Sequence, residues 1–423
     1  MGAKSNGSVW PVVPLGQIAR KVTRKNTGGL TRVLTASGKQ GLVDQREYFS
    51  RSVAGADLSS YYHLRRGEFA YNRSEMDGYP YGAIKRLERY SDGIVSILYI
   101  CFSLFDPDCD QDFYTHLFES GLLNPQFRSI AKVGGRAHGL LNVSDSDFYA
   151  IQVPKPPIEL QRRVTRTLNA VDEAIEATRA VIEQTRRLKS ALLQELLTKG
   201  LPGRHRSYRS IYRIGRIPAD WSDARLGEVA EVVQGIAIDP SRTPKVQPTP
   251  YLRVANVQQG SLDLSEIKKI ETSETERKNL GLKVNDVLMV EGHANIEELG
   301  RAALVPKAAE GMVFQNHLFR VRPDRNRLDP RFLTIWINSP SGRRYFKIFG
   351  GTTSGLNTVG SGQIRALRLP LPEIKEQHSI CNVLESLDDR VLSAEDDLNQ
   401  LTTVKSALSQ GLLTGRIRVK GGR

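Results

Sequence analysis

Residues of the types that can hydrogen bond with nucleic-acid bases occur together in several stretches of this 423-residue chain. Arginine pairs with guanine, asparagine and glutamine pair with adenine, and glutamate accepts a hydrogen bond from cytosine. Arginine beside a phosphate instead positions the nucleic acid without specifying its sequence. Each such residue taken alone is also a common type of exposed polar residue. In the first third of the chain the candidate contacts are Tyr61, Arg65, Tyr71, Asn72, Arg73, Ser74, Tyr79, Tyr81, Arg136 and His138. Beyond residue 220 they are Asn256, Gln258, Glu291, His293, Asn295, Asn316, His317, Arg343, Arg344 and Thr352.

A basic segment separates these two groups. Residues 204–216 hold five arginines, and the first acidic residue after them is Asp220. Dense positive charge suits contact with phosphates, and a solvated linker explains the segment equally well. Arg204, Arg206 and Arg209 are therefore further candidate contacts with DNA.

The whole chain is basic. It holds 60 Lys and Arg against 46 Asp and Glu, which gives a formal net charge of +14 at pH 7. Basic side chains that neutralise phosphates release condensed counterions, so this balance favours a polyanionic partner. A basic soluble protein without such a partner is the alternative.

Sequence motifs of enzymes and metal sites are absent. The chain has no GxxxxGK[ST] phosphate loop, no GxGxxG turn and no HExxH pair. Cys101, Cys109 and Cys381 form no CxxC pair. The sequence therefore predicts a protein that is not an enzyme, with no catalytic residue, metal site, cofactor or disulfide of its own.

Apolar residues form no run of the roughly 18–20 residues that a transmembrane helix needs. The first eight residues are polar and lack the apolar region of a signal peptide. We therefore expect a cytoplasmic protein that does not enter a membrane.

The chain contains an internal repeat. Residues 151–200 align without a gap against residues 367–416, and 15 of the 50 positions are identical, including a KSAL run at 189–192 and 405–408. The segments upstream echo each other more faintly, with Trp10 against Trp221. In this alignment Arg73 corresponds to Glu291, so the two globular segments are expected to prefer different ligands.

Both copies of the repeat predict a long helix. Apolar residues recur at alternating steps of four and three over five heptads, which is typical of a coiled coil. About 40 residues per helix correspond to roughly 60 Å. Packing of the two stripes predicts an antiparallel pair with a globular domain near each end. The predicted packing residues are Val164, Leu168, Val171, Ile175, Ile182, Leu192, Leu196, Ile380, Leu384, Leu387, Val391, Leu398, Leu401, Leu408 and Leu412.

The globular segments are expected to be mixed α/β. Frequent glycine and polar turns separate short apolar runs. Residues 93–100 are typical of a buried strand, and residues 113–117 and 332–337 are predicted to be helical. The predicted fold class is α/β, with two such domains separated by two long antiparallel coiled-coil helices in a pseudo-two-fold repeat. The predicted parts are a first recognition domain at 1–153, a helix at 154–203, a basic linker at 204–220, a second recognition domain at 221–369, a helix at 370–416 and a basic tail at 417–423.

Two phrases of the sequence resemble a known family. IGRIP at residues 214–218, with Trp221 and LGEV at 226–229, opens a domain, and LPLPEIKEQ at 369–377 closes one and begins a helix. Both are similar to the specificity subunit of type I restriction–modification systems. The first copy departs from the pattern, because Leu160 stands where the family usually has Glu and the opening phrase before Trp10 is missing.

The resemblance implies a function for each part. Each globular domain would read one half of a bipartite, asymmetric site in double-stranded DNA, and residues 71–74 and 289–293 would lie near the DNA. The helices would set the gap between the halves and bind two modification subunits, which methylate adenine with S-adenosylmethionine. Restriction subunits that use ATP and Mg would then join. A coiled-coil DNA-binding adaptor or regulator outside restriction is the alternative.

Overall fold

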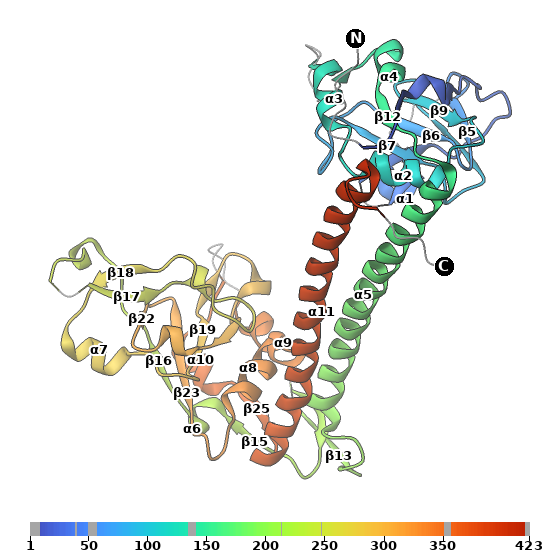
Figure 1. Ribbon diagram of the computed structural model, residues 1–423. Coiled ribbons are helices and arrows are strands. Elements are labelled where there is room, and N and C mark those ends of the chain that lie inside the picture. The colour runs from blue at the N-terminus through green and yellow to red at the C-terminus, as the bar shows by residue number, and fades with distance from the viewer. Residues whose placement is uncertain are drawn as a thin grey trace. The chain divides into compact units, whose positions relative to one another are not determined.

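The computed structural model describes residues 9–38, 40–49, 57–133, 141–212, 214–246, 248–350 and 357–418. The chain forms two compact units (Figure 1). The first unit comprises residues 1–180 and 395–423, and the second comprises residues 181–394. Two long helices, α5 (Ile158–Lys199) and α11 (Ile374–Thr414), each contribute one half to either unit.

The first unit is built on a four-stranded antiparallel sheet in the order β2-β9-β6-β7. Two-stranded pairings β1–β12, β3–β4, β5–β8 and β10–β11 surround it. The elements are β1 (Val12–Pro14), a 3-10 turn (Leu15–Gln17), β2 (Ala19–Lys21), β3 (Leu34–Ser37), β4 (Gly41–Asp44), α1 (Gln45–Tyr48), β5 (Tyr62–Arg65), β6 (Phe69–Asn72), β7 (Ala83–Arg86), β8 (Asp92–Val95), β9 (Ile100–Leu104), α2 (Gln111–Glu119), α3 (Asn124–Ile130), β10 (Lys132–Val133), β11 (Leu141–Asn142), α4 (Asp145–Ala150) and β12 (Gln152–Pro154).

The second unit contains an equivalent sheet in the order β16-β23-β19-β21, and adds a three-stranded sheet β18-β17-β22 and the pairings β13–β14, β15–β25 and β20–β24. Its strands are β13 (Tyr208–Ile211), β14 (Gly215–Pro218), β15 (Ser222–Arg225), β16 (Ala230–Gln234), β17 (Pro248–Leu252), β18 (Lys268–Glu271), β19 (Val287–Val290), β20 (Gly292–His293), β21 (Ala302–Leu304), β22 (Val313–Phe314), β23 (Leu318–Pro323), β24 (Asn357–Thr358) and β25 (Arg368–Leu371). Its helices are α6 (Leu226–Val229), α7 (Glu274–Leu280), α8 (Pro330–Asn338), α9 (Pro340–Phe349) and α10 (Ser361–Ala366), with 3-10 turns at Pro240–Arg242, Val254–Asn256, Ile296–Glu298 and Lys307–Ala309.

The main sheets of the two units share one frame. Phe69 pairs with Phe102 between β6 and β9, and Val287 pairs with Val321 between β19 and β23. The turn before each central strand has the same strained backbone, because Gly67 has φ +90° and Asn285, two residues before its strand as well, has φ +69°. The predicted internal repeat is thus confirmed in three dimensions.

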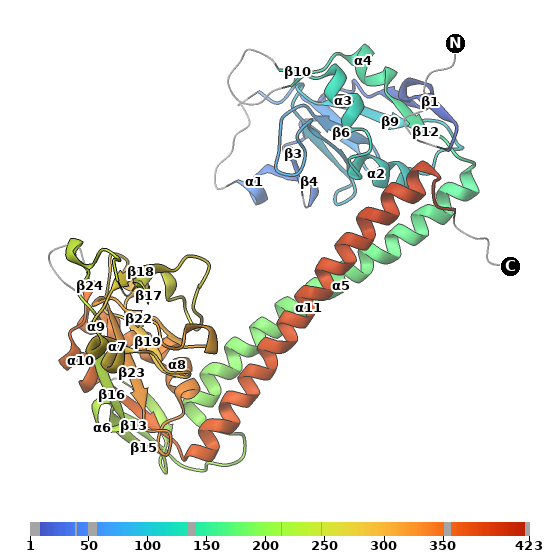
Figure 2. The same ribbon diagram turned by 60° about the vertical axis from the view of Figure 1, so that its left-hand side comes forward.

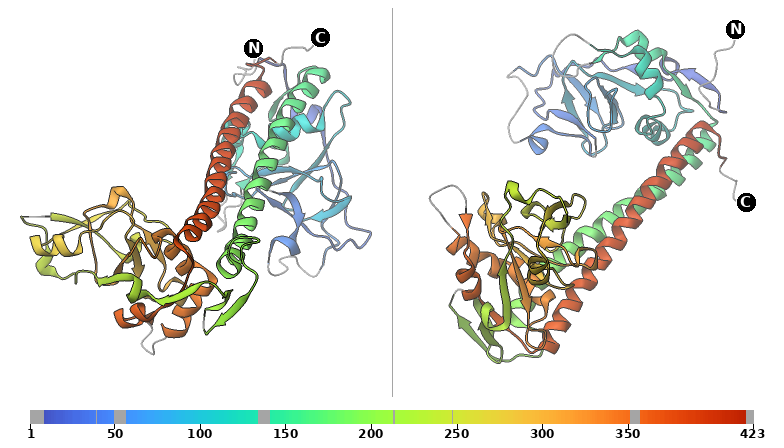
Figure 3. Two further views of the ribbon diagram at one scale, coloured as in Figure 1. Left: turned by 90° about the horizontal axis from the view of Figure 1, so that it is seen from below. Right: turned by 90° about the vertical axis from the view of Figure 1, so that its left-hand side faces the viewer.

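Both faces of the main sheet in the second unit are buried. Val287 and Met289 of β19 share a core with α8 and the long helices, whereas Leu288 and Val290 share a second core with β17 and β22. This alternation follows from the two-residue period of a strand. Helix α8 lies between the sheet and the long helices, and the β17–β18 strands are labelled in the same view (Figure 2). Figure 3 shows α5 and α11 side by side from two further directions.

The prediction of one continuous strand was wrong, because a turn divides it. We expected residues 93–100 to form a single buried strand, but β8 ends at Val95 and β9 begins at Ile100. Ile97 and Leu98 lie on the turn between them and are 51% and 50% exposed. The predicted helices at 113–117 and 332–337 are confirmed within α2 and α8.

The long helices form an antiparallel coiled coil within each unit. Val164 and Leu168 of α5 share a core with Leu412 of α11 in the first unit. In the second unit Leu196 of α5 shares a core with Ile380 of α11. All the stripe residues are buried or partly buried. Among the described residues, no helix combines the length and apolar character needed to cross a bilayer.

A buried glutamine joins each long helix to its globular part. In the first unit the Gln161 amide accepts from the backbone N–H of Asp110 at 2.8 Å and donates to the carbonyl oxygens of Asp108 and Pro156. Gln161 is 0% exposed. These three bonds satisfy the polar groups of the buried Gln161 amide with backbone partners.

The second unit contains the same arrangement at the matching position of the repeat. The Gln377 amide accepts from the N–H of Asp329 at 2.8 Å and donates to the carbonyl oxygens of Arg327 and Pro372. Gln377 is also 0% exposed. The repeated helix entry thus preserves a structural junction that both units need.

The first unit also joins the two ends of the described chain. The N–H of Val9 donates to the carbonyl oxygen of Thr414 at 2.7 Å, and Trp10 Nε1 donates to the carbonyl oxygen of Leu412 at 3.0 Å. In the second unit Trp221 shares a core with Leu196 at the corresponding end of α5. Each long helix therefore ends against a tryptophan.

Two ion pairs between the helices are related by the repeat. Lys189 pairs with Asp388 in the second unit, and Lys405 pairs with Asp172 in the first. The two lysines occupy equivalent positions of the repeat, and so do the two aspartates. The two pairs therefore specify the same antiparallel register in both units.

We expect the Lys405→Asp variant to lose about 0.5–1 kcal/mol of unfolding free energy, because Asp172 then faces a like charge. Adding Asp172→Lys should restore most of the loss, since the pair is rebuilt in reverse. Chemical denaturation of the single and double variants measures both effects. Equal loss in the double and single variants would show that the pair does not interact.

Candidate nucleic-acid interface

Arg73 and Glu291 occupy the same place in the two units. Each follows the central strand of its main sheet, β6 or β19. The Arg73 carbonyl accepts from the N–H of Leu141 at 2.7 Å, and the Glu291 carbonyl accepts from the N–H of Val359 at 2.9 Å. The equivalence inferred from the sequence therefore extends to the backbone hydrogen bonds.

The edge of the second unit carries a polar cluster. Glu291 Oε2 lies 2.8 Å from His317 Nδ1, and Glu291 Oε1 accepts from Gln234 Nε2 at 3.2 Å. Gln234 ends β16 and His317 precedes β23, so the cluster follows from strands that end at one edge of the sheet. His317 was a predicted contact, whereas Gln234 was not. The placement of both side chains beside Glu291 depends on the strand order, which the sequence did not supply.

The same edge of the first unit differs in chemistry. Arg73 Nε donates to the carbonyl oxygen of Leu98 at 2.7 Å, and its Nη1 donates to that of Val143 at 3.3 Å. In the registers of the two sheets, the half-exposed Ile97 and Leu98 correspond to Asn316 and His317. A cation and two aliphatic side chains thus replace a carboxylate, an amide and an imidazole.

Residues around Arg73 form a second polar group. Asn72 Oδ1 accepts from the N–H of Ser74 at 3.2 Å. The Tyr79 hydroxyl donates to Glu119, and Lys85 Nζ donates to both groups. Tyr61 and Tyr81 are partly exposed and Arg65 is exposed. The structure brings Asn72, Arg73 and Ser74 together at the edge of the sheet, while Tyr61 and Arg65 belong to the neighbouring β5 segment.

Three predicted contacts have side chains inside the protein. Tyr71 is 0% exposed and its hydroxyl donates to the Tyr81 carbonyl, and burial raises its pKa above the ordinary value. Asn256 is 3% exposed and its amide donates to the carbonyl of Asp263. Arg343 is 9% exposed, and burial lowers its pKa. These side chains face the core, and their polar groups are satisfied there.

The basic linker is folded rather than solvated. Strands β13 (Tyr208–Ile211) and β14 (Gly215–Pro218) pair as an antiparallel hairpin. The Arg209 guanidinium donates to Asp223 at 2.9 Å, and Arg204 lies 3.3 Å from the buried carboxylate of Glu376. Arg204 is thus paired with α11 and Arg209 with β15, so the linker is not the free, flexible segment that its charge suggested. Arg206 is exposed.

Other predicted contacts of the second unit are exposed or partly exposed. His293 Nδ1 accepts from the N–H of Asn295 at 3.0 Å. Gln258, Asn295 and Arg344 are exposed, and His293 and Asn316 are partly exposed. Arg136, His138 and Thr352 lie outside the described residues.

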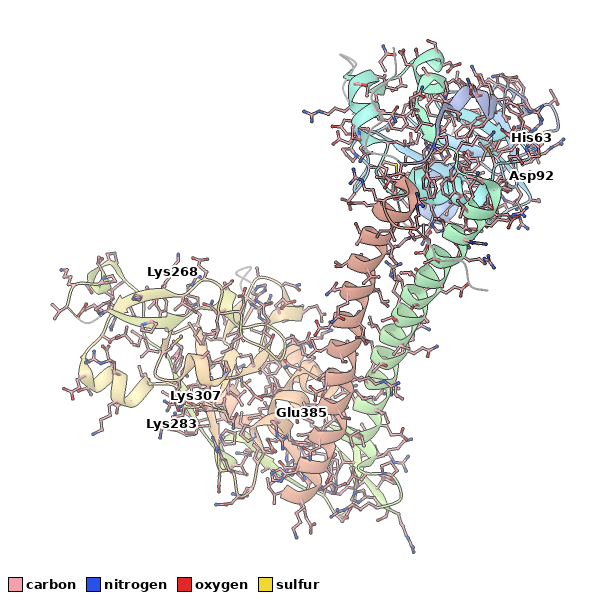
Figure 4. The ribbon with its side chains drawn as sticks, in the orientation of Figure 1. His63, Asp92, Lys268, Lys283, Lys307 and Glu385 are labelled. Carbon is pink, nitrogen blue, oxygen red and sulfur yellow. The ribbon has the colours of Figure 1, made fainter. Side chains whose placement is uncertain are left out.

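Further charges project from the surfaces of both units (Figure 4). Lys268, Lys283 and Lys307 are exposed on loops and strand ends of the second unit. His63 and Asp92 face each other between β5 and β8 at 3.9 Å. Exposed lysines of this kind contact phosphates without selecting bases.

Nothing among the described residues is arranged for metal binding: no three His, Cys, Asp or Glu side chains converge. Cys101 and Cys381 are buried free thiols, and burial raises the pKa of each to about 12. Such thiols are protonated near neutral pH and are poor nucleophiles.

The chain is similar to known specificity proteins. Residues 218–403 match the family described as "Type I restriction modification DNA specificity domain". The StySPI specificity subunit of Salmonella potsdam is 24% identical over 66% of this chain and 59% of its own length. The EcoKI specificity subunit of Escherichia coli (strain K12) is 23% identical over 72% of this chain and 64% of its own length. The match thus spans about three-fifths of the length of these relatives.

Two solved structures share the fold over nearly the whole chain. A chain from work on complex assembly and conformational transition of the type I R-M system aligns with a TM-score of 0.60 and 17% identity, covering 96% of this chain and 98% of that one. The HsdS subunit from Thermoanaerobacter tengcongensis aligns with a TM-score of 0.52 and 17% identity over 96% and 97%. The fold defines a duplicated protein with two mixed α/β domains and two coiled-coil helices. The predicted resemblance to the specificity subunits of type I restriction–modification systems is therefore confirmed.

Proposed function

We propose that this chain is the sequence-reading subunit of a type I restriction–modification complex. Each globular part reads one half of a bipartite, asymmetric site in double-stranded DNA. The observation that carries the proposal is the pair of matched sheet edges, with Arg73 on one and Glu291 on the other. A common frame that presents different hydrogen-bonding groups is what two unlike half-sites require.

The long helices provide the spacer in this proposal. They set the gap between the half-sites and bind two adenine methyltransferase subunits, to which restriction subunits are added. The chain itself carries no catalytic residues. S-adenosylmethionine belongs to the modification subunits, and ATP and Mg belong to the restriction subunits. The net charge of +14 supports association with DNA.

Mapping methylated adenines after reconstitution with the methyltransferase subunits tests the proposal. We expect one bipartite motif, and replacing residues 1–150 by those of a relative should change only one half of it. A change in both halves would contradict the assignment of one half-site to each unit. Methyl transfer by the purified chain alone would show that it is an enzyme.

DNA binding by the chain separates this function from that of a coiled-coil adaptor without DNA affinity. Affinity should fall steeply with salt, because phosphate contacts release counterions. A gel shift between about 50 and 200 mM salt, where six to ten such contacts cost roughly 10³–10⁵-fold, measures this dependence. No binding at low salt would favour the adaptor.

A further inference from the structure

A rigid turn of the second unit presents His317 at the edge of the main sheet. The N–H of Asn316 donates to the Ile236 carbonyl at 2.8 Å. A Cβ at Gly235 would lie only 2.3 Å from the Gln315 carbonyl oxygen, so this close approach of two backbones requires glycine. The backbone that carries His317 is therefore fixed before any ligand binds.

Glu291 is more deeply buried than its partner His317. The Glu291 side chain is 18% exposed, whereas the His317 side chain is 52% exposed. Both Glu291 oxygens have partners within the protein, Gln234 on one and His317 on the other. A recessed carboxylate with two such partners is better placed to orient the imidazole than to contact a base itself.

We propose that His317 is a specificity-determining residue of the second unit and that Glu291 is its positioning residue. This inference rests on the proposed function. A carboxylate only accepts hydrogen bonds, so the Nδ1 that faces Glu291 carries the proton, and Nε2 of the neutral ring is an acceptor. In the major groove an acceptor selects adenine or cytosine on the contacted strand, because these bases offer exocyclic amino groups.

The first unit has a different group at the corresponding place. Leu98 occupies the position that corresponds to His317. Arg73 donates a hydrogen bond to the Leu98 carbonyl, whereas Glu291 hydrogen bonds with the His317 ring. An exposed leucine offers no hydrogen bond and suits the methyl group of thymine. The two units therefore select different bases at structurally matching positions.

The test uses the full chain reconstituted with its methyltransferase subunits and a DNA library in which every position of the site is varied, assayed at pH 8. We expect His317→Ala to remove the preference at a single position of one half-site by about tenfold or more. The other half-site should be unchanged. Glu291→Leu should weaken the same preference, and Glu291→Gln should restore part of it, because an amide oxygen still accepts from Nδ1.

His378→Ala provides the matched control, because His378 is 51% exposed but lies on α11. The control should leave the whole motif unchanged. A uniform loss of binding by His317→Ala, with every base preference intact, would give the residue only a structural role and overturn the inference. Relaxation at a guanine or thymine would overturn the acceptor assignment. Absence of any bipartite motif with the unaltered chain would instead contradict the proposed function.

Discussion

Replacing Gln377 by leucine is expected to lower the unfolding free energy of the second unit by about 3 kcal/mol. Leucine is of similar size but makes none of the three hydrogen bonds of the Gln377 amide. The N–H of Asp329 and two carbonyl oxygens then lose their partner at a site that is shielded from water. Each buried group left unpaired costs roughly 1–3 kcal/mol, and some relaxation reduces the sum. Differential scanning calorimetry measures the shift.

The repeat and the helix supply controls for this experiment. Gln161→Leu should destabilise the first unit to a similar extent, because its amide makes the same three bonds. Gln400→Leu changes an exposed glutamine of α11 and should alter stability by less than about 0.5 kcal/mol. If both buried variants match the exposed one, the glutamine junctions do not stabilise the units.

Lengthening both long helices by one heptad is expected to widen the gap between the half-sites without changing the bases read. Seven residues add about 10 Å to a helix, which corresponds to roughly three base pairs at most. A full heptad also keeps the apolar stripe in phase. The insertions belong between Ala180 and Val181 of α5 and between Asp396 and Asp397 of α11, which are corresponding points of the repeat. Mapping of methylated adenines measures the new gap.

An insertion into α5 alone is the informative control. It shifts one stripe against the other and separates Lys189 from Asp388, so we expect a less stable protein and no new defined gap. An unchanged gap after the paired insertion would show that the helices do not set the distance between the half-sites. The proposed spacer role would then fail while the two reading units remained.

The repeat and the helices could be predicted because their signals are local and periodic. Apolar residues at steps of three and four define the buried side of α5 and α11 whatever the rest of the chain does. The Lys189–Asp388 pair and its repeat could not be foreseen in the same way, because its partners lie far apart in the sequence. Only the antiparallel register brings them together.

The candidate site was predicted less well, for a physical reason. Tyr71 and Arg73 lie two residues apart, yet Tyr71 enters the core and Arg73 lies at the edge where β6 has ended. A short strand gives too few residues to determine which face is buried. The pairing of His317 with Glu291 was not predicted for a related reason, because it depends on the side-by-side arrangement of β16, β19 and β23.

The basic linker was predicted from its local charge alone, but a buried acidic residue far away in the sequence pairs with it. Arg204 and His205 both contact Glu376, which is 1% exposed and lies at the other end of the second globular part in the sequence. The same carboxylate accepts from Trp221 Nε1 at 3.1 Å. Counting nearby charges suggested a free basic linker, whereas the compensating charge comes from the beginning of α11.

The tryptophan at the end of each long helix has a topological consequence. Trp221 follows α5 through a covalent linker, whereas Trp10 meets the end of α11 through non-covalent contacts. A covalent link between the end of α11 and Trp10 would therefore give both long helices the same kind of connection to a globular part. Joining Thr414 to Val9 and opening the exposed turn at Gly203 would yield a circular permutant with the same packing. The order of the two globular parts along the gene is therefore not fixed by the fold.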